Sequence, residues 1–136
     1  MSDQEKVCIN LSVIDLGKID LLVSEGYYAN RTDFIKDAIR NGLDQHKTAI
    51  DNRVHANSFV VGILSLTAKD LEEIVQKGKT LDIYVVGMLH ISSNVPPALA
   101  EKAIGTVTVN GVIKAEKEVL EVLNSKRIRS SRRVRK

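Results

Sequence analysis

The sequence predicts an α+β protein with two unlike halves and a basic tail. In residues 6–11 apolar and polar side chains alternate, and in residues 12–43 apolar side chains recur every three or four positions. These patterns predict one strand followed by two helices. In residues 58–124 an apolar strand followed by a helix recurs three times, which predicts a small β/α repeat domain.

The first strand has one apolar face and one polar face. Its apolar side chains are Val7, Ile9 and Leu11, and its polar side chains are Lys6, Cys8 and Asn10. One short strand cannot form a sheet alone, so we expect it to pair with the same strand of a second copy. The homodimer would then display a two-stranded ribbon, a shape that fits the major groove of double-stranded DNA.

Capping residues mark the ends of the two helices that follow. Ser12 is expected to cap a first helix over residues 13–25, and Gly26 is expected to end it in a left-handed conformation. Asn30 is expected to cap the second helix, with Asp33 completing a variant of the capping box. The expected inward stripes are Leu16, Ile19, Leu22 and Val23 in the first helix, and Ile35, Ala38, Ile39, Gly42 and Leu43 in the second.

Residues 6–43 resemble the ribbon-helix-helix DNA-binding family, the group of Arc, MetJ and CopG. The most similar part is the run GYYANRTDFIKDAIR, from Gly26 to Arg40. The resemblance implies a β-α-α unit that forms an intertwined dimer. It also implies a transcriptional regulator, and a repressor in particular.

The resemblance further implies two groups of DNA contacts. Side chains of the ribbon would read bases: Lys6 would donate to guanine, Asn10 would pair with adenine, and Cys8 would touch a thymine methyl group. The start of the second helix, with Asn30, Arg31 and Thr32, would hold a DNA phosphate through its free backbone N–H groups.

The second half carries an internal repeat. Residues 59–66 (FVVGILSL) are echoed by residues 84–91 (YVVGMLHI) and more weakly by residues 107–114 (VTVNGVIK), so their glycines lie 25 and 24 residues apart. Helical stretches follow at residues 69–77, 97–103 and 115–123. This period predicts a β/α solenoid of the leucine-rich-repeat kind. A compact α+β domain, such as the regulatory domains that follow this DNA-binding motif in some nickel-responsive repressors, is the competing interpretation.

A three-repeat stack is expected to leave both ends open. Exposed strand edges favour pairing between subunits, so we expect a higher homo-oligomer assembled through residues 58–124. The predicted organisation is therefore a DNA-binding and dimerisation domain over residues 1–47, a polar hinge over 48–57, the repeat domain over 58–124, and a flexible tail over 125–136.

The charge of the chain is concentrated at its end. The tail carries seven basic residues, which are expected to bind DNA phosphates without sequence preference. The rest of the chain has 13 basic and 17 acidic residues, a net charge of −4. The basic residues of the tail are Lys126, Arg127, Arg129, Arg132, Arg133, Arg135 and Lys136.

Other classes of function lack a signal in the sequence. His46, His55 and His90 match no metal-ligand spacing, and no catalytic constellation is present, so we expect no metal, no cofactor and no enzymatic activity. The single Cys8 suits a reducing compartment, and no apolar run is long enough to span a membrane. The expected location is the cytoplasm, in association with the nucleoid.

Three functions remain open. The first is a sequence-specific DNA-binding regulator that is dimeric through its ribbon and further assembled by its second half. The second is an antitoxin whose second half blocks a toxin, although an antitoxin tail is usually low in apolar residues. The third is a self-assembling structural protein that attaches to DNA.

Overall fold

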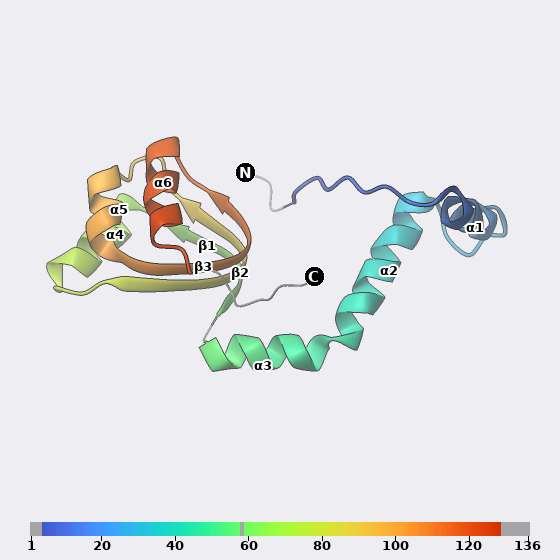
Figure 1. Ribbon diagram of the computed structural model, residues 1–136, viewed down its shortest axis with the longest axis horizontal. Helices are drawn as coiled ribbons and strands as arrows, with labels where there is room; N and C mark the ends of the chain where they lie inside the picture. Colours follow the sequence, from blue (N-terminus) through green and yellow to red (C-terminus); the bar gives the residue numbers. More distant parts are fainter. Residues whose placement is uncertain (1–3, 58, 129–136) are drawn as a thin grey trace. The chain divides into compact units, whose positions relative to one another are not determined.

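A computed structural model describes residues 4–57 and 59–128 (Figure 1). The chain divides into two compact units, Met1–Asn52 and Arg53–Lys136. Mixed helices and a sheet confirm the expected α+β class. None of the helices in the described residues is long and apolar enough to cross a membrane.

The first unit contains a pair of helices whose ends follow the capping signals. Helix α1 spans Val13–Ser24, and the Ser12 side chain caps it by accepting a hydrogen bond from the Asp15 N–H. Gly26 takes a φ of 89° after the helix. There the N–H groups of Gly26 and Tyr27 donate to the carbonyls of Val23 and Leu22, which satisfies the last turn. Helix α2 then spans Arg31–Gln45.

The predicted strand over residues 6–11 is absent from the single chain. These residues form neither helix nor strand, although Val7 and Ile9 still alternate with polar neighbours and are 79% and 63% exposed. The physical reason is that a strand is defined by hydrogen bonds to a second strand, and the described part of the first unit contains no other. The ribbon therefore stays a prediction that needs two chains.

Residues 48–57, predicted to form a polar hinge, are helical in the structure. Helix α3 spans Lys47–Asn57, and an ion pair at helical spacing joins Lys47 to Asp51 across 2.8 Å. Polar residues predict exposure, but they do not break a helix unless Gly or Pro is among them, and none is present here. The boundary between the compact units nevertheless falls inside this segment.

The second unit is a parallel three-stranded sheet with helices between its strands. The elements follow in the order β1 (Val60–Leu66), α4 (Ala68–Gln76), β2 (Leu81–Ile91), α5 (Pro97–Ala103), β3 (Ile104–Lys114) and α6 (Lys117–Ser125). The strand order is β1-β2-β3. Helices α4, α5 and α6 lie side by side on one face of the curved sheet (Figure 1).

The repeated glycines stand in register across the sheet. Gly62 is the neighbour of Gly87, and Gly87 is the neighbour of Gly111, so the spacing read from the sequence matches the pairing of the strands. All three have φ between 130° and 135°. A side chain on Gly87 would collide with the carbonyl oxygen of Gly62, and one on Gly111 with that of Gly87. The glycines therefore allow three strands to bend at one level.

One hydrophobic core lies between the sheet and its helices. It is aliphatic, as the shortage of aromatic residues predicts, and several of its side chains are completely buried. Its buried members are Leu66, Leu71, Ile83, Val85, Leu89, Ile91, Val95, Ala100, Ala103, Ile104, Val107, Val109, Val119 and Leu123. This core contrasts with residues 4–52, where Ile19 alone is buried.

The two edges of the sheet differ, which corrects the expectation that both ends are open. Residues 126–128 run beside β3: the Ile128 N–H donates to the Val107 carbonyl across 2.8 Å, and the Val107 N–H donates to the Lys126 carbonyl across 3.1 Å. Residues 126–128, which the sequence analysis placed in the tail, thus contact the sheet. Edge strand β1 has no such cover, and most of its residues are exposed.

Candidate nucleic-acid interface

The three residues predicted to read bases lie in the extended segment before α1. Lys6, Cys8 and Asn10 are all exposed, and Cys8 is a free thiol. Their apolar neighbours Val7 and Ile9 are exposed as well. The segment is therefore accessible to a partner on both faces, and the single chain does not bring the three polar side chains together on a platform.

The start of α2 is built as an anion-compatible helix end. The Asn30 side chain accepts from the Asp33 N–H across 2.8 Å, and the Asp33 carboxylate accepts from the Ala29 N–H across 3.1 Å. Such a cap leaves the first N–H groups of the helix, those of Arg31 and Thr32, without an acceptor inside the helix. The predicted cap is confirmed, and both N–H groups belong to residues predicted to hold a phosphate.

Arg31 is engaged with a carboxylate that the sequence analysis did not single out. Its Nε and Nη2 donate to the two carboxylate oxygens of Asp20, each across 2.8 Å. The hydrogen bond from Arg31 holds the pKa of Asp20 below its ordinary value of 3.8, and the pair raises the pKa of Arg31. Both side chains are about half exposed, 54% and 50%, so the pair is solvated.

A second polar contact links the turn between the two helices to α2. The Tyr28 hydroxyl donates to the Asp37 carboxylate across 3.0 Å, and this bond raises the pKa of Tyr28. The Tyr28 ring also meets the Phe34 ring edge to face, with centroids 5.0 Å apart. Together with the pair between Arg31 and Asp20, this contact fixes where α2 begins relative to α1.

Sequence reasoning missed Asp20 and Tyr28 for a physical reason. Each pairs with a residue nine or eleven positions away, across a turn whose geometry the sequence leaves undetermined. The available signal was the polarity of Asp20 on a helix whose other face is apolar, and that signal alone does not name a partner.

The model of the Ribbon-Helix-Helix transcriptional regulator family matches residues 2–120. The chain belongs to this family. No curated protein and no solved structure gives a significant match.

Membership of the ribbon-helix-helix family confirms the resemblance seen in residues 6–43. The match continues through both compact units and ends within α6, so the sheet unit is part of what the family model describes. Ribbon-helix-helix regulators bind DNA and usually dimerise, and they are typically not enzymes.

The basic tail of this ribbon-helix-helix protein divides into two parts. Lys126 forms an ion pair with Glu101 across 2.8 Å, and Arg127 donates to the Val109 carbonyl across 2.9 Å. These two residues are thus engaged within the second unit, although the sequence placed them in a free tail. The other five predicted tail contacts, Arg129, Arg132, Arg133, Arg135 and Lys136, lie outside the described residues.

The histidines do not converge on a site within the described chain. His46 follows α2, His55 lies in α3, and His90 lies near the end of β2. Within residues 4–57 and 59–128 there is no group of three or more His, Cys, Asp or Glu side chains placed to hold a metal ion.

Proposed function

We propose that the chain is a sequence-specific DNA-binding repressor that acts as a homodimer in the cytoplasm, on the nucleoid. The observation that carries the proposal is the segment before α1. Its apolar side chains Val7, Ile9 and Leu11 are 79%, 63% and 40% exposed in the single chain. Pairing with a second copy would bury this face in an antiparallel ribbon and leave the polar face outward.

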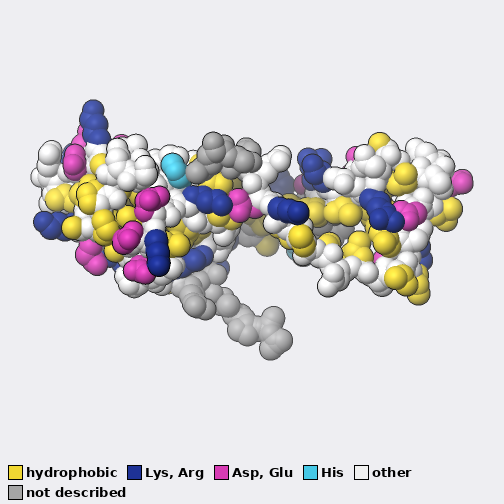
Figure 2. All heavy atoms as spheres, turned by 90° about the horizontal axis from the view of Figure 1, so that it is seen from above, with side chains coloured by type: hydrophobic (Ala, Val, Ile, Leu, Met, Phe, Trp, Pro, Cys, Tyr) yellow, Lys and Arg dark blue, Asp and Glu magenta, His cyan; other side chains and the backbone are white. Residues whose placement is uncertain are grey.

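The weak core of the first unit supports the same dimer. Ile39 and Leu43 lie on the apolar face of α2 and are 56% and 55% exposed. Hydrophobic side chains are visible at the surface of this unit in Figure 2. Burial of such a face contributes roughly 25 cal/mol per Å² of apolar surface, so the isolated unit gains stability from a second copy.

DNA contacts would divide between reading and positioning. On the ribbon, Lys6 and Asn10 would donate to base edges and Cys8 would make an apolar contact. At the start of α2, Asn30, Arg31 and Thr32 would hold a phosphate, which fixes the register on the duplex. The basic residues beyond Ile128 would add attraction without sequence preference.

The second unit is proposed to act in assembly, as a three-repeat β/α domain that joins dimers into a higher oligomer. A self-assembling structural protein attached to DNA is the second candidate function, because the exposed strand β1 offers an edge for association. No comparable observation favours the antitoxin.

The test compares DNA binding of the full chain with that of Lys6→Ala/Asn10→Ala. Probes are the DNA upstream of the protein's own gene and scrambled DNA of equal length, each across a range of salt. We expect the variant to lose its preference for the first probe by at least roughly tenfold, since each base contact contributes about 1–3 kcal/mol of discrimination.

Lys18→Ala is the matched control, because it removes the same charge from α1 and leaves the ribbon intact. It should lower affinity slightly for both probes and keep the preference. If Lys6→Ala/Asn10→Ala binds both probes as the unaltered chain does, the ribbon does not read bases and the structural candidate takes precedence.

A further inference from the structure

Side chains at the same level of the sheet differ sharply in exposure between its two edges. Val60, Val85 and Val109 are register partners on β1, β2 and β3, and they are 43%, 0% and 5% exposed. On the opposite face, Ile63 of β1 is 48% exposed and its partner Met88 is 4% exposed. Within the described chain, β1 therefore lacks a neighbouring strand on its outer side.

Strand β1 lacks the features that protect an edge strand. Its sequence, VVGILSL, has no charged residue and no proline, and Val61 is 64% exposed. Natural edge strands usually carry Lys, Pro or a bulge, because an unprotected edge presents a row of free N–H and C=O groups to other strands. The edge of β1 is therefore competent to pair with another strand.

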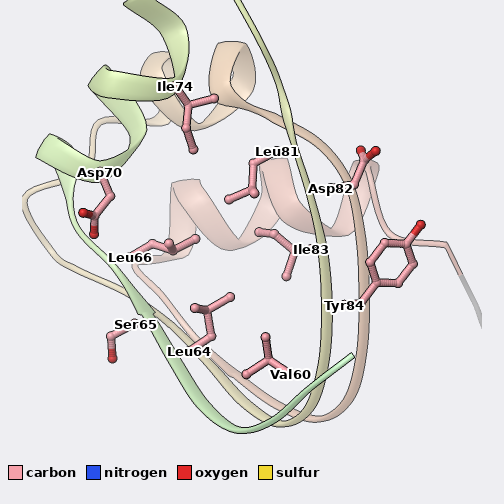
Figure 3. A pocket seen from close by; sticks show the side chains of 10 residues that line it. All are labelled: Val60, Leu64, Ser65, Leu66, Asp70, Ile74, Leu81, Asp82, Ile83 and Tyr84. Atoms are coloured by element: carbon pink, nitrogen blue, oxygen red, sulfur yellow. The ribbon is translucent and has the colours of Figure 1, made fainter. Parts of the chain in front are cut away.

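A pocket of about 500 Å³ is lined by residues of β1, α4 and the first half of β2. Figure 3 shows apolar side chains from β1, α4 and the start of β2 pointing into it, whereas Ser65, Asp82 and Tyr84 point away. The inward side chains are Val60, Leu64, Leu66, Ile74, Leu81 and Ile83.

The carboxylates that line this pocket are already engaged. Asp82 accepts from the N–H and hydroxyl of Thr106 across 3.1 and 2.9 Å, and Asp70 accepts from the Thr67 N–H across 2.9 Å. A small-molecule site needs a few convergent polar groups to orient its ligand. The pocket offers apolar surface instead, which suits contact with a segment of another protein chain.

The opposite edge is unfavourable for an open stack of identical units. In a head-to-tail stack, the repeat spacing would place Val60 of the next copy beside Val109 of β3. The Val109 carbonyl is taken by the Arg127 guanidinium, and the adjacent Val107 is paired with residues 126–128. With β3 occupied there, β1 can meet the edge of another β1, in a closed arrangement.

We propose that β1 pairs antiparallel with β1 of a second copy around a two-fold axis, so that two three-stranded sheets become one. The pairing supplies the lateral neighbour that Val61 and Ile63 lack and covers the mouth of the apolar pocket. It sharpens the assembly proposed above and rests on that part of the proposed function, but not on base reading by the ribbon.

The size of this contact sets its strength. Two edges of seven residues bury less than the roughly 1,200 Å² of a stable interface, so the contact is weak between free molecules. A dimer joined through its first units carries two β1 edges, so two dimers can form two such contacts at once, and the second contact forms at a high effective concentration.

The test is hydrogen exchange of the full chain with Val61→Lys, which places a charge on the proposed interface at an exposed position. In the unaltered protein, all β1 amides should exchange slowly, including those that point to the outer edge. In Val61→Lys the outer-edge amides should exchange about tenfold faster or more, while β2 and β3 keep their protection. Ile128→Lys, an equal change at a residue 51% exposed beside β3, should leave β1 protected.

A second measurement separates this contact from the ribbon. Ile9→Lys places a charge on the proposed ribbon interface, so sedimentation should show only weak association that rises with concentration. Adding Val61→Lys should remove that association. If the outer-edge amides of β1 exchange equally fast in the unaltered chain and in Val61→Lys, the proposal is overturned, and the Lys6→Ala/Asn10→Ala result on DNA preference stands independently.

Discussion

The ion pair between Arg31 and Asp20 decides how much charge the start of α2 offers to DNA. Arg31 is predicted to contact phosphate, yet its Nε and Nη2 donate to the Asp20 carboxylate. Because the pKa of Asp20 is held below 3.8, the pair is intact above that pH and is lost as the pH falls through the lowered pKa. At any pH where DNA binds, Asp20 therefore occupies the Nε and Nη2 side of Arg31 and offsets its charge.

Removing Asp20 should strengthen DNA binding. In Asp20→Ala, Arg31 keeps its charge and loses its carboxylate partner, so we expect affinity for specific and scrambled DNA to rise by roughly three- to tenfold, the effect of about one added phosphate contact. The slope of log affinity against log salt should steepen by about one per subunit. Fluorescence anisotropy with labelled duplexes measures both.

Glu25→Ala is the control for this prediction, since it removes one negative charge from the end of α1 without freeing Arg31. It should raise affinity less than Asp20→Ala does. Reduced affinity in Asp20→Ala at unchanged helix content would mean that Asp20 serves to position Arg31, and that the pair is part of the DNA-binding surface.

The three strands of the sheet approach one another closely at their glycines. Gly62 and Gly87 share nearly the same φ, 130° and 135°, but a side chain meets open space at Gly62 and the Gly62 carbonyl at Gly87. The two positions thus separate the cost of an unfavourable φ from the cost of steric overlap between strands. A side chain on Gly62 of edge strand β1 would meet no steric overlap, because no strand of the described chain lies beyond β1.

Alanine at these two positions should therefore differ in effect. Gly62→Ala is expected to lower the free energy of unfolding by about 1–3 kcal/mol, the cost of a strained backbone conformation. Gly87→Ala is expected to cost clearly more, because β1 must move away from β2. Urea denaturation followed by circular dichroism measures both, and equal losses would show that the strands separate without difficulty at this level.

The spacing of residues predicted some elements well and others poorly. The caps Ser12 and Asn30 and the glycine register follow from local chemistry and from a period, so they could be read directly. The strand over residues 6–11 depends on a partner chain. The cover of β3 by residues 126–128 depends on contacts about twenty residues apart, which a run of basic residues does not reveal.

The candidate site shows the same division. Asn30 lies where its capping role predicts, while the partner of Arg31 could not be read from the sequence because it belongs to another helix. The core of the second unit is aliphatic, as expected for a chain with no Trp, two Phe and three Tyr. The sequence did not predict that Ile19 alone would be buried in residues 4–52, because their apolar stripes resemble those of two helices that form a core by themselves.

Charge is distributed unevenly along the chain. Residues 1–47 hold six basic and eight acidic groups, a net charge of −2. Residues 129–136 hold five basic residues and no acidic residue. An acidic DNA-binding unit attracts DNA weakly, so the basic end is expected to supply much of the affinity without affecting base preference.

Two truncations separate the electrostatic role of this end from its structural role. A chain that ends at Ile128 loses five basic residues but keeps the contacts of residues 126–128 with β3. It should bind specific and scrambled DNA more weakly by the same factor, with a smaller salt slope and an unchanged melting temperature. The reason is that each lost phosphate contact removes about 0.9 from the salt slope, and none of these residues is expected to contribute to base reading.

A chain that ends at Asn124 should in addition be less stable. It loses the hydrogen bonds between Val107 and residues 126–128, and the Lys126 ion pair with Glu101. Uncovering this edge is expected to cost about 1–3 kcal/mol of unfolding free energy and to lower the melting temperature of the second unit. If both truncated chains melt at the temperature of the full chain, residues 126–128 do not stabilise β3, and the difference between the two edges of the sheet loses its physical basis.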